Sequence, residues 1–588
     1  MTRLTDEQRA FANHCEAVFV EACPGAGKTR TIVERIARIA ASLPPRRGIA
    51  VLSFTNTAVE EFVNQCRGAG LDRVLMHPGF VGTFDAFLRQ FFFSPGGIEG
   101  VGLRPTVVDS WESLGIEIRL RGPNVFRGPG VSLDRFDAET NRIDPASIQH
   151  NGLRAHVRGH QAAYQKRAES RRQALRENGY VSAEDVRVDL VRRLLRPGWS
   201  AALGRALASR FAEVIVDEAQ DCNPLDCRIV EWLRVHRIAV TVVADPDQAI
   251  YGFRHGSPLD LRTLSRSYAP RDRLTLTGNF RSSPPICGVA ATLRTRATPD
   301  TSLGETATIA EPVHVLAYHG ALVPASIGRT FLELMTAAGV ARQDGIVLAH
   351  ARRNALRACG LGAEEEPGDS HVARIAQAVG MLWSRSGSNR VRETALRTVE
   401  WALLDLMGRI DEGEVPSRAA ERRGLDPRWL RRSALQLVTR LPRTCSDSND
   451  SRAAWVTALR DGTLRLPITP RDGMSVPRYF RSRADADWQR LLGAHDASDV
   501  RSATIHEAKG RQYDAVCVVF PPDRPPTRRT DHLFTCWENR KDDEAKRVVY
   551  VGITRARKLG VIAVPAPFSD RLAAILRAAE ANWQLHGL

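Results

Sequence analysis

Lysine is scarce in this sequence of 588 residues, which affects how its positive charge is interpreted. The six lysines stand at positions 28, 166, 509, 541, 546 and 558, and lysine and arginine together number 83, which leaves 77 arginines. With 67 acidic residues, the formal net charge is +16. The excess fits a genome that favours arginine codons, and it also fits a polyanionic partner, because guanidinium groups pair with phosphate. Because lysine is rare here, a lysine inside a phosphate-binding pattern is harder to attribute to chance.

Other features are missing as well. No run of 18 apolar residues occurs, which argues against a transmembrane helix, and the start, MTRLTDEQRA, lacks the apolar core of a signal peptide. The ten cysteines form no CxxC pair, so they are expected to be thiols in a reducing compartment and not a disulfide or zinc framework. The hydrophobic fraction of 43% is ordinary for a globular protein. We expect a multidomain cytoplasmic enzyme with no membrane partner.

Short apolar runs that end in polar residues occur in two series, as is typical of buried parallel strands. The first series lies at 17–22, 49–54, around Val81, 214–216 and 238–244, and the second at 345–349, 503–505, 514–520 and 559–564. The sequence therefore predicts two parallel-sheet α/β cores.

The clearest chemical motif is ACPGAGKT at 22–29, which contains the GxGK[ST] part of a Walker A loop, with an alanine as its first residue. An apolar run at 17–22 precedes it and a helical pattern begins at Lys28, which is the context that the motif requires. Backbone N–H groups in such a turn bind phosphate oxygens. Lys28 is predicted to neutralise the β- and γ-phosphates of ATP, and Thr29 to ligate Mg²⁺.

A second motif, VIVDEAQD at 214–221, complements the first. An apolar strand would deliver Asp217 to Mg²⁺, and Glu218 could polarise the attacking water as general base. An Asp-Glu pair after a strand is by itself more often a helix cap. Its pairing with the 22–29 loop favours the catalytic interpretation, so the sequence predicts nucleotide hydrolysis.

Eight further segments occur in the order found in superfamily 1 helicases of the UvrD, Rep and PcrA branch, and the chain resembles this family from residue 4 to residue 564. The segments are LTDEQ (4–8), FTNTAVEEF (54–62), GTFDAF (82–87), ADPDQAIYGFR (244–254), LTGNFRS (276–282), GIVLAHARRN (345–354), TIHEAKGRQYD (504–514) and VVYVGITRAR (548–557). The resemblance implies an α/β fold with two RecA-like motor domains and two largely helical accessory insertions. It also implies an ATP-dependent single-stranded DNA translocase and 3′–5′ DNA helicase that uses Mg²⁺.

The resemblance implies roles for single residues. Gln248 would sense the γ-phosphate, and Arg281 and Arg555 would be arginine fingers from opposite sides of the cleft. The nucleotide would be contacted by Gln8 and Phe280 at adenine, Arg30 beside the base, Gln512 near the ribose, and the loop residues Ala22, Cys23, Pro24, Gly25, Ala26, Gly27, Lys28 and Thr29. The single strand would be contacted by Phe54, Asn56, Thr83, Tyr251, Phe253, Arg254, Thr504 and His506. For Phe54 and Phe253, burial under the sheet edge is an equally good interpretation.

The same resemblance suggests the domain boundaries. The first motor domain would comprise 1–94 and 201–290, interrupted by an accessory insertion at 95–200, and the second would comprise 291–365 and 495–588, interrupted by a reduced insertion at 366–494. We expect the four tryptophans of that last segment to pack in its core. Two residues depart from the family pattern, because Gln512 replaces a usual Glu and Asp85 a common His. Lys509 has no assigned role.

Two functions stay open from sequence. One is a motor on single-stranded DNA and duplex junctions, and the other is a nucleotide-dependent DNA-binding switch within a larger repair or phage-defence assembly. The full set of catalytic residues favours the motor. A fused nuclease is not expected, because the chain ends soon after 548–557. Compact chains of this kind resemble the helicase subunits of Gabija-type defence systems, which act with a separate nuclease subunit.

Overall fold

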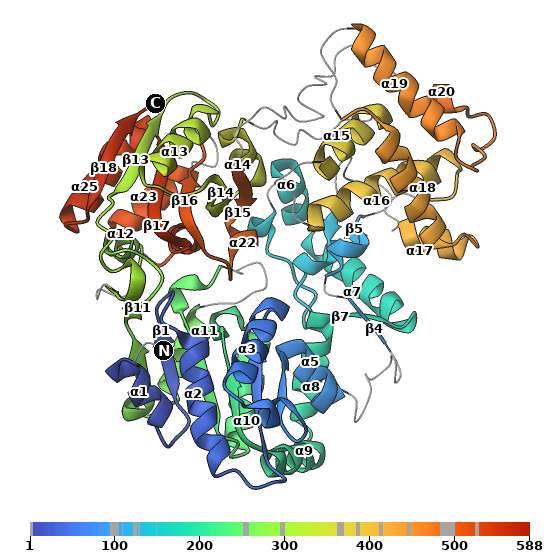
Figure 1. Cartoon of the computed structure of the whole chain (residues 1–588). Helices are drawn as coiled ribbons and strands as arrows, with labels where there is room; N and C mark the ends of the chain where they lie inside the picture. Colours follow the sequence, from blue (N-terminus) through green and yellow to red (C-terminus); the bar gives the residue numbers. More distant parts are fainter. Residues whose placement is uncertain are drawn as a thin grey trace. The chain divides into compact units, whose positions relative to one another are not determined.

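The computed structural model describes residues 4–93, 101, 105–108, 110–120, 126, 130–148, 150–250, 258–294, 300–360, 370–383, 389–410, 416–443, 449–481, 500–523 and 529–588. The chain forms two compact units (Figure 1). The first unit is Met1–Arg281 with Thr298–Ala307, and the second is Ser282–Ala297 with Thr308–Leu588. The chain thus leaves the first unit after Arg281 and returns to it for one short segment.

A parallel sheet of six strands in the order β10-β1-β9-β8-β2-β3 forms the centre of the first unit. Its strands are β1 (Phe19–Ala22), β2 (Gly48–Ser53), β3 (Phe80–Thr83), β8 (Phe211–Val216), β9 (Val240–Ala244) and β10 (Arg273–Leu276). One face is covered by α1 (Asp6–Asn13), α2 (Lys28–Ala41) and α3 (Asn56–Gly68), and the other by α5 (Phe84–Leu88), α8 (Ala183–Leu194), α9 (Pro197–Arg210), α10 (Pro224–Val235) and α11 (Pro258–Arg266). Every residue of β2 and β9 is buried, as expected when helices cover both faces of a sheet.

A smaller core stands apart from this sheet within the first unit. Its elements are β4 (Thr106–Val108), β5 (Glu117–Ile118), β6 (Val131–Ser132), α6 (Asn151–Gly159), α7 (Gln161–Glu177) and β7 (Tyr180–Ser182). Trp111 and Tyr164 are buried at its centre. The expected insertion was placed at 95–200, but α8 and α9 belong to the main core, because their apolar faces pack beside Phe92 and Phe211.

The second unit contains another parallel sheet of six strands, in the order β15-β14-β16-β17-β13-β18. Its strands are β13 (Val313–Tyr318), β14 (Gly345–Ala349), β15 (Arg501–Thr504), β16 (Tyr513–Val519), β17 (Ala556–Pro565) and β18 (Trp583–Gly587). The helices around it are α12 (Pro284–Thr292), α13 (Ser326–Ala337), α14 (Arg352–Ala358), α22 (Ile505–Ala508), α23 (Arg529–Glu538), α24 (Glu544–Ile553) and α25 (Ser569–Ala578). The predicted α/β class with two parallel sheets is confirmed.

Between β14 and β15 the chain forms a helical subdomain with its own core. Its helices are α15 (His371–Trp383), α16 (Asn389–Leu406), α17 (Pro416–Arg422), α18 (Pro427–Arg440), α19 (Asn449–Leu464) and α20 (Val476–Tyr479). Trp455 is buried in that core, and Trp383, Trp401 and Trp429 pack against it half-buried. The expectation that these tryptophans serve packing is therefore met.

Helix α12 belongs to the second unit, although residue 290 is the expected end of the first motor domain. The reason is packing and hydrogen bonding. The Nε atom of Arg294, just after α12, donates to the Tyr550 hydroxyl of α24 at 2.8 Å, and the Ser282 hydroxyl donates to the Ala556 carbonyl at 2.7 Å. Residues of the returning segment pair with the first unit, where β12 (Thr301–Ser302) lies parallel to β11 (Gly278–Asn279).

Two further expectations can be compared with the described residues. Among the helices within those ranges, none has both the length and the apolar character needed to cross a membrane. Nine cysteines fall inside the same ranges, and each is a free thiol.

Candidate nucleotide site and nucleic-acid track

The loop between β1 and α2 has the backbone of a phosphate-binding turn. Gly25 and Gly27 adopt the left-handed region, with φ of 74° and 70°. Gly27 is the N-cap of α2 and offers no side chain to cap it. The first turn of α2, which contains Lys28 and Thr29, therefore keeps its backbone N–H groups for an anion.

The segment after β10 holds this loop in place. The Leu276 carbonyl accepts a hydrogen bond from Cys23 N at 3.0 Å, and Phe280 N donates to the Gly25 carbonyl at 2.9 Å. Asn279, a buried residue that the sequence did not single out, accepts from Arg281 N at 2.9 Å. A Cβ atom built on Gly25 would lie 2.5 Å from the Cβ of Arg281. The main chain at Phe280 and Arg281 therefore lies directly beside the phosphate loop, and Phe280 is half-buried there.

Gly25→Ala is expected to lower the free energy of unfolding by about 1–3 kcal/mol, because alanine there meets both an unfavourable φ and the Arg281 side chain. Chemical denaturation without nucleotide measures this. Gly68→Ala is the matched control, since a Cβ at Gly68 in α3 meets nothing within 4 Å. Equal stability of the two variants would contradict the tight approach at Gly25.

Helix α1 connects the phosphate loop to the segment after β10. Gln8 is buried, its Nε2 donates to the Ala26 carbonyl at 2.9 Å, and its Oε1 accepts from Thr5 N at 3.0 Å. Glu7 accepts from both N and Oγ1 of Thr277, at 2.6 and 2.7 Å. The Gln8 amide is thus fixed by protein contacts, and it retains one N–H and one lone pair that could recognise a base.

The acidic pair lies where β8 ends, facing Lys28. Asp217 N donates to the Leu52 carbonyl at 2.8 Å, and Asp217 Oδ1 accepts from Glu218 N at 2.9 Å. Glu218 Oε1 accepts from Lys28 Nζ at 2.8 Å. Glu218 has a left-handed backbone, φ 55° and ψ 37°, a conformation that costs a non-glycine residue about 1–3 kcal/mol and that is concentrated at functional sites.

A chain of hydrogen bonds continues from this pair to the end of β9. The other carboxylate oxygen of Glu218 accepts from Gln220 Nε2. Gln220 Oε1 accepts from Asp245 N at 3.0 Å, and Asp245 Oδ2 accepts from Gln248 Nε2 at 2.8 Å. Sequence reasoning placed Lys28, Glu218 and Gln248 at the site but missed Gln220 and Asp245, although both lie inside the segments it quoted.

The electrostatics of the acidic pair favour a bound cation. Burial and the neighbouring Glu218 raise the pKa of Asp217 to about 7, although Lys28 opposes the shift. Burial alone would lower the pKa of Lys28, but Glu218 and Asp217 outweigh it, so that this pKa is raised. A divalent cation would stabilise the buried Asp217 anion. The Asp217 carboxylate and the Thr29 hydroxyl are the oxygen ligands that Mg²⁺ prefers, so these residues fit the ion.

The second unit carries Arg555 and Gln512 at one edge of its sheet. The two residues directly precede the paired strands β17 and β16, and Tyr513 N donates to the Arg555 carbonyl at 3.0 Å. Arg555 is buried, and its Nε donates to the Val551 carbonyl at 3.0 Å, whereas Gln512 is exposed. The guanidinium group is therefore held in a fixed orientation at the end of α24.

The expected DNA contacts of the first unit follow β2 and β3. Asn56 is exposed at the start of α3, and Thr83 is the N-cap of α5, where its hydroxyl accepts from Ala86 N at 3.1 Å. Phe54 is half-buried and stacks on Phe84 with ring centroids 5.4 Å apart, so one of its faces is covered by protein. Tyr251, Phe253 and Arg254 lie outside the described residues.

Asp85, which replaces a common histidine of the family pattern, has a charge partner in the structure. Its Oδ1 lies 2.8 Å from an Nη atom of buried Arg187 in α8. The Nε of Arg187 donates to the buried Asp226 carboxylate in α10 at 2.6 Å. Burial by itself would lower the pKa of Arg187, but Asp226 and Asp85 outweigh it and raise this pKa. Arg187 of α8 therefore links Asp85 of α5 to Asp226 of α10.

The expected DNA contacts of the second unit lie where β15 ends and α22 begins. Thr504 is the N-cap of α22, and its hydroxyl accepts from Glu507 N at 3.2 Å. The Glu507 carboxylate lies 3.2 Å from Arg352. His506 lies with its ring centroid 5.6 Å from that of His350, a residue at the end of β14 that the sequence did not assign to the site. Burial, with a smaller contribution from His506, lowers the pKa of His350.

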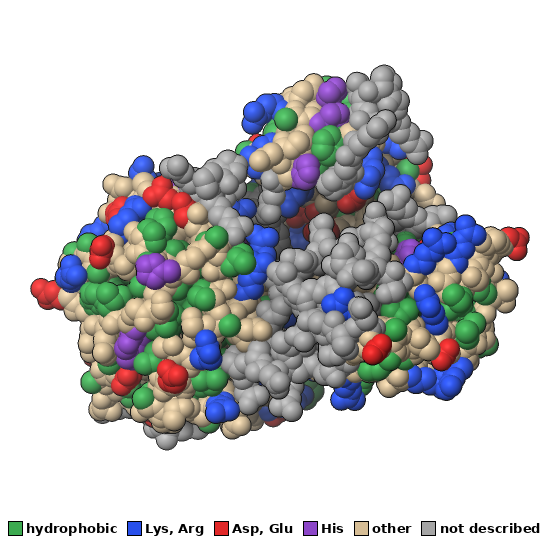
Figure 2. Space-filling view, turned by 90° about the horizontal axis from the view of Figure 1, so that it is seen from above, with side chains coloured by type: hydrophobic (Ala, Val, Ile, Leu, Met, Phe, Trp, Pro, Cys, Tyr) green, Lys and Arg blue, Asp and Glu red, His purple; other side chains and the backbone are tan. Residues whose placement is uncertain are grey.

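Surface charge alone does not show where a nucleic-acid strand would bind. Figure 2 shows Lys and Arg side chains on many parts of the face in view, interspersed with acidic and apolar ones. The net charge of +16 is thus consistent with a general preference for arginine. Specific positions at the strand ends are the better indication of where a polymer would bind.

Each unit contains a parallel six-stranded sheet; the first carries a phosphate loop and an acidic pair after its strands, and the second carries a buried arginine just before one of its strands. These features are those of a P-loop nucleotide hydrolase. The sequence model of the UvrD/REP helicase N-terminal domain matches residues 4–93 and 136–269, and that of the UvrD-like helicase C-terminal domain matches 489–564. The chain belongs to the UvrD/Rep family of superfamily 1 helicases.

Individual relatives agree with this assignment. The ATP-dependent DNA helicase UvrD2 of Mycobacterium tuberculosis is 26% identical over an alignment of 599 positions that covers 94% of this chain and 77% of that protein. The ATP-dependent DNA helicase PcrA of Leuconostoc citreum is 25% identical over 46% of this chain and 36% of its own length. The putative ATP-dependent DNA helicase YjcD of Bacillus subtilis is 35% identical over 82 residues, 14% of this chain and 11% of that protein.

Proposed function

We propose that the protein is an ATP-dependent DNA helicase of the cytoplasm that moves 3′ to 5′ along single-stranded DNA and separates strands at duplex junctions. Membership of the UvrD/Rep family supports the activity class. The observation that carries the proposal is the chain of hydrogen bonds from Lys28 through Glu218 and Gln220 to Asp245 and Gln248. Through this chain, the presence or loss of the γ-phosphate beside Lys28 would change the hydrogen bonds of Asp245 and Gln248 after β9.

Hydrolysis would use the residues at the strand ends in distinct roles. Lys28 and the N–H groups of the loop would bind the β- and γ-phosphates, while Glu218 would accept the proton of the attacking water. Thr29 and Asp217 would hold Mg²⁺, which supplies charge neutralisation at the phosphate oxygens when bound. Binding of ATP would displace Lys28 from Glu218 and leave this carboxylate available as a base.

Coupling to DNA would use the neighbouring strands of the first sheet. Strands β8, β2 and β3 are adjacent, so Asp217 and the track residues Asn56 and Thr83 follow strands of one parallel sheet at its carboxyl edge. Thr83 and Thr504 both accept a backbone hydrogen bond as N-caps. Each hydroxyl keeps its own proton for a phosphate oxygen of the strand.

The proposal predicts that ATP hydrolysis rises on addition of single-stranded DNA and that a 3′-tailed duplex is unwound much faster than a 5′-tailed one. Strand displacement with fluorescent duplexes of equal length measures the polarity, and Glu218→Gln serves as the variant without hydrolysis. DNA affinity should fall steeply with salt, because phosphate contacts release counterions. DNA-stimulated hydrolysis without unwinding of either tail would instead indicate the nucleotide-dependent switch, acting with a partner such as a nuclease.

A further inference from the structure

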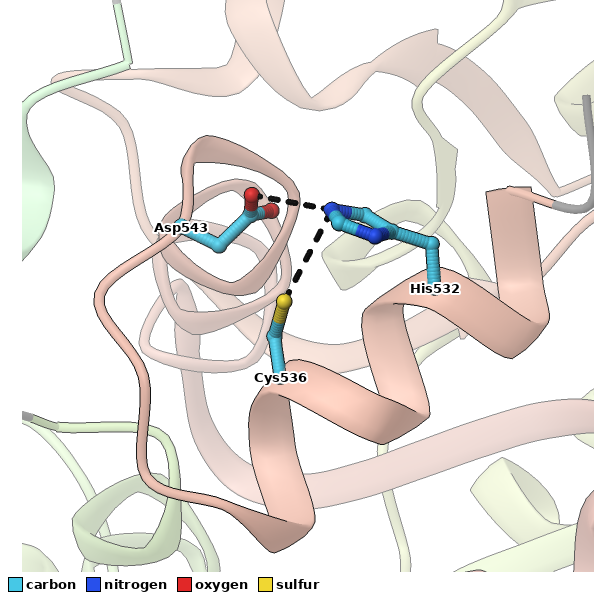
Figure 3. Close-up of side chains that lie close together, drawn as sticks. All are labelled: His532, Cys536 and Asp543. Atoms are coloured by element: carbon cyan, nitrogen blue, oxygen red, sulfur yellow. Dashed lines mark hydrogen bonds and ion pairs between the residues drawn. The ribbon is translucent and has the colours of Figure 1, made fainter.

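Three side chains of different types converge beside the helix that precedes Arg555. His532 and Cys536 are four residues apart in α23, so they lie on the same face of that helix. Asp543 is the N-cap of α24, where its Oδ1 accepts from Ala545 N at 2.8 Å. Figure 3 shows the imidazole, the thiol and the carboxylate pointing toward one another. None of the three is used by the nucleotide site.

The two distances from His532 Nε2 within this cluster are close to those between ligands of one small metal ion. His532 Nε2 lies 3.1 Å from Asp543 Oδ2 and 3.6 Å from Cys536 Sγ, and the three ligand atoms lie within 4.8 Å of one another. Tetrahedral Zn²⁺ with ordinary bond lengths places nitrogen and oxygen ligands about 3.3 Å apart, and nitrogen and sulfur ligands about 3.5 Å apart. The two spacings from His532 Nε2 differ from these by a few tenths of an ångström, and the 4.8 Å limit on the third leaves room for an ion among the three ligand atoms.

Hydrogen bonding alone explains the cluster less well. Both the carboxylate and the sulfur approach the same atom, His532 Nε2. A neutral imidazole either donates its one proton from this nitrogen or accepts one there, so it cannot make a good bond of both kinds at once. A cation bound to the nitrogen lone pair satisfies all three groups simultaneously.

We propose that His532, Cys536 and Asp543 bind a Zn²⁺ ion. One thiolate and one carboxylate neutralise its two positive charges, and the neutral imidazole supplies the third ligand. His532 is largely exposed while Cys536 is buried. The fourth position therefore faces solvent on the imidazole side, where water can complete the tetrahedron.

The ion would join α23 to the N-terminus of α24. Helix α24 ends at Ile553, two residues before Arg555, so the metal would fix the start of the helix that leads to this buried arginine. Two other contacts already hold α23, because Arg571 of α25 pairs with Asp531 at 2.7 Å and with Glu538 at 2.6 Å. A metal clip would add a link between α23 and α24 that is independent of nucleotide.

Cobalt titration of the full-length, chelator-treated protein tests the site. One equivalent of Co²⁺ should bind with the near-ultraviolet sulfur-to-cobalt absorption and the visible bands of a tetrahedral site, and Zn²⁺ should displace it. Cys536→Ser should abolish the sulfur-to-cobalt band. Asp543→Asn should weaken binding at least about tenfold while keeping the cap, because asparagine is as good an N-cap as aspartate.

Cys15→Ser is the matched control, because Cys15 is an exposed free thiol in the first unit. It should leave the cobalt spectrum and the stoichiometry unchanged. Circular dichroism shows whether each variant is folded. The proposal is overturned if the folded wild-type chain shows no saturable sulfur-to-cobalt band, or if Cys536→Ser keeps it.

Discussion

Alanine in place of Arg281 or Arg555 is expected to lower kcat for ATP hydrolysis by about 10³–10⁵-fold. Both arginines would stabilise charge that develops on the γ-phosphoryl group in the transition state, so ATP affinity should fall far less than kcat. The Cβ atom of Arg281 lies beside Gly25 of the phosphate loop. The Arg555 guanidinium is buried and is oriented by the Val551 carbonyl at 3.0 Å. Steady-state hydrolysis and a fluorescent-nucleotide binding assay separate the two effects.

Arg557→Ala is the matched control for Arg555. Arg557 lies two residues further along, is partly exposed and pairs with Asp514 at 3.2 Å, so its loss should change kcat little. The double variant of Arg281 and Arg555 should be scarcely slower than either single variant, as expected for groups that act as a unit. A folded Arg555→Ala or Arg281→Ala protein with a near-normal kcat would remove that arginine from the mechanism.

Lys28→Ala is expected to reduce hydrolysis by about 10²–10³-fold or more, because it removes the positive charge nearest the phosphates. It should also weaken ATP binding, since Lys28 contacts the nucleotide in the ground state as well. Lys166→Ala in α7 removes one of the other five lysines from an exposed position and should leave the rate unchanged. Hydrolysis rates and nucleotide affinities of the two variants give the comparison.

Glu218→Gln distinguishes the role of the base from that of the lysine. Glutamine keeps the shape of the side chain but cannot take a proton, so hydrolysis should fall by about 10²–10⁴-fold while ATP still binds. A glutamine also weakens the hold on Lys28, which leaves the ammonium group free for phosphate. Loss of ATP binding in this variant would mean that Glu218 maintains the structure of the site instead of acting in catalysis.

Local patterns were sufficient to predict the central elements. The helix expected to begin at Lys28 does so as α2, and the runs at 345–349 and 214–216 lie in β14 and β8. The two strand segments are fully buried, so their apolar composition reflects their environment directly. Strands β10 and β18 at the sheet edges gave a weaker signal, because most of their residues are exposed or half-buried and they show no apolar run.

Contacts between distant segments were beyond such patterns. Arg187 is joined to Asp85 across 102 positions of sequence, and no spacing rule connects the two residues. Asn279 reaches the phosphate loop, and Gln220 the end of β9, only because the sheet order brings β10, β1, β9 and β8 together. The sequence therefore predicts which chemical groups the site contains more readily than which polar partners hold them.

At Glu218 the left-handed backbone favours one residue type for stability, whereas the proposed chemistry requires another. Glycine would relax the main chain there, and asparagine would tolerate it better than glutamate does. Neither carries a carboxylate that could accept a proton or pair with Lys28. Variants selected for thermal robustness alone would thus drift toward an inactive residue at this site. A glutamate at 218 would therefore keep a proton-accepting carboxylate at the expense of some stability.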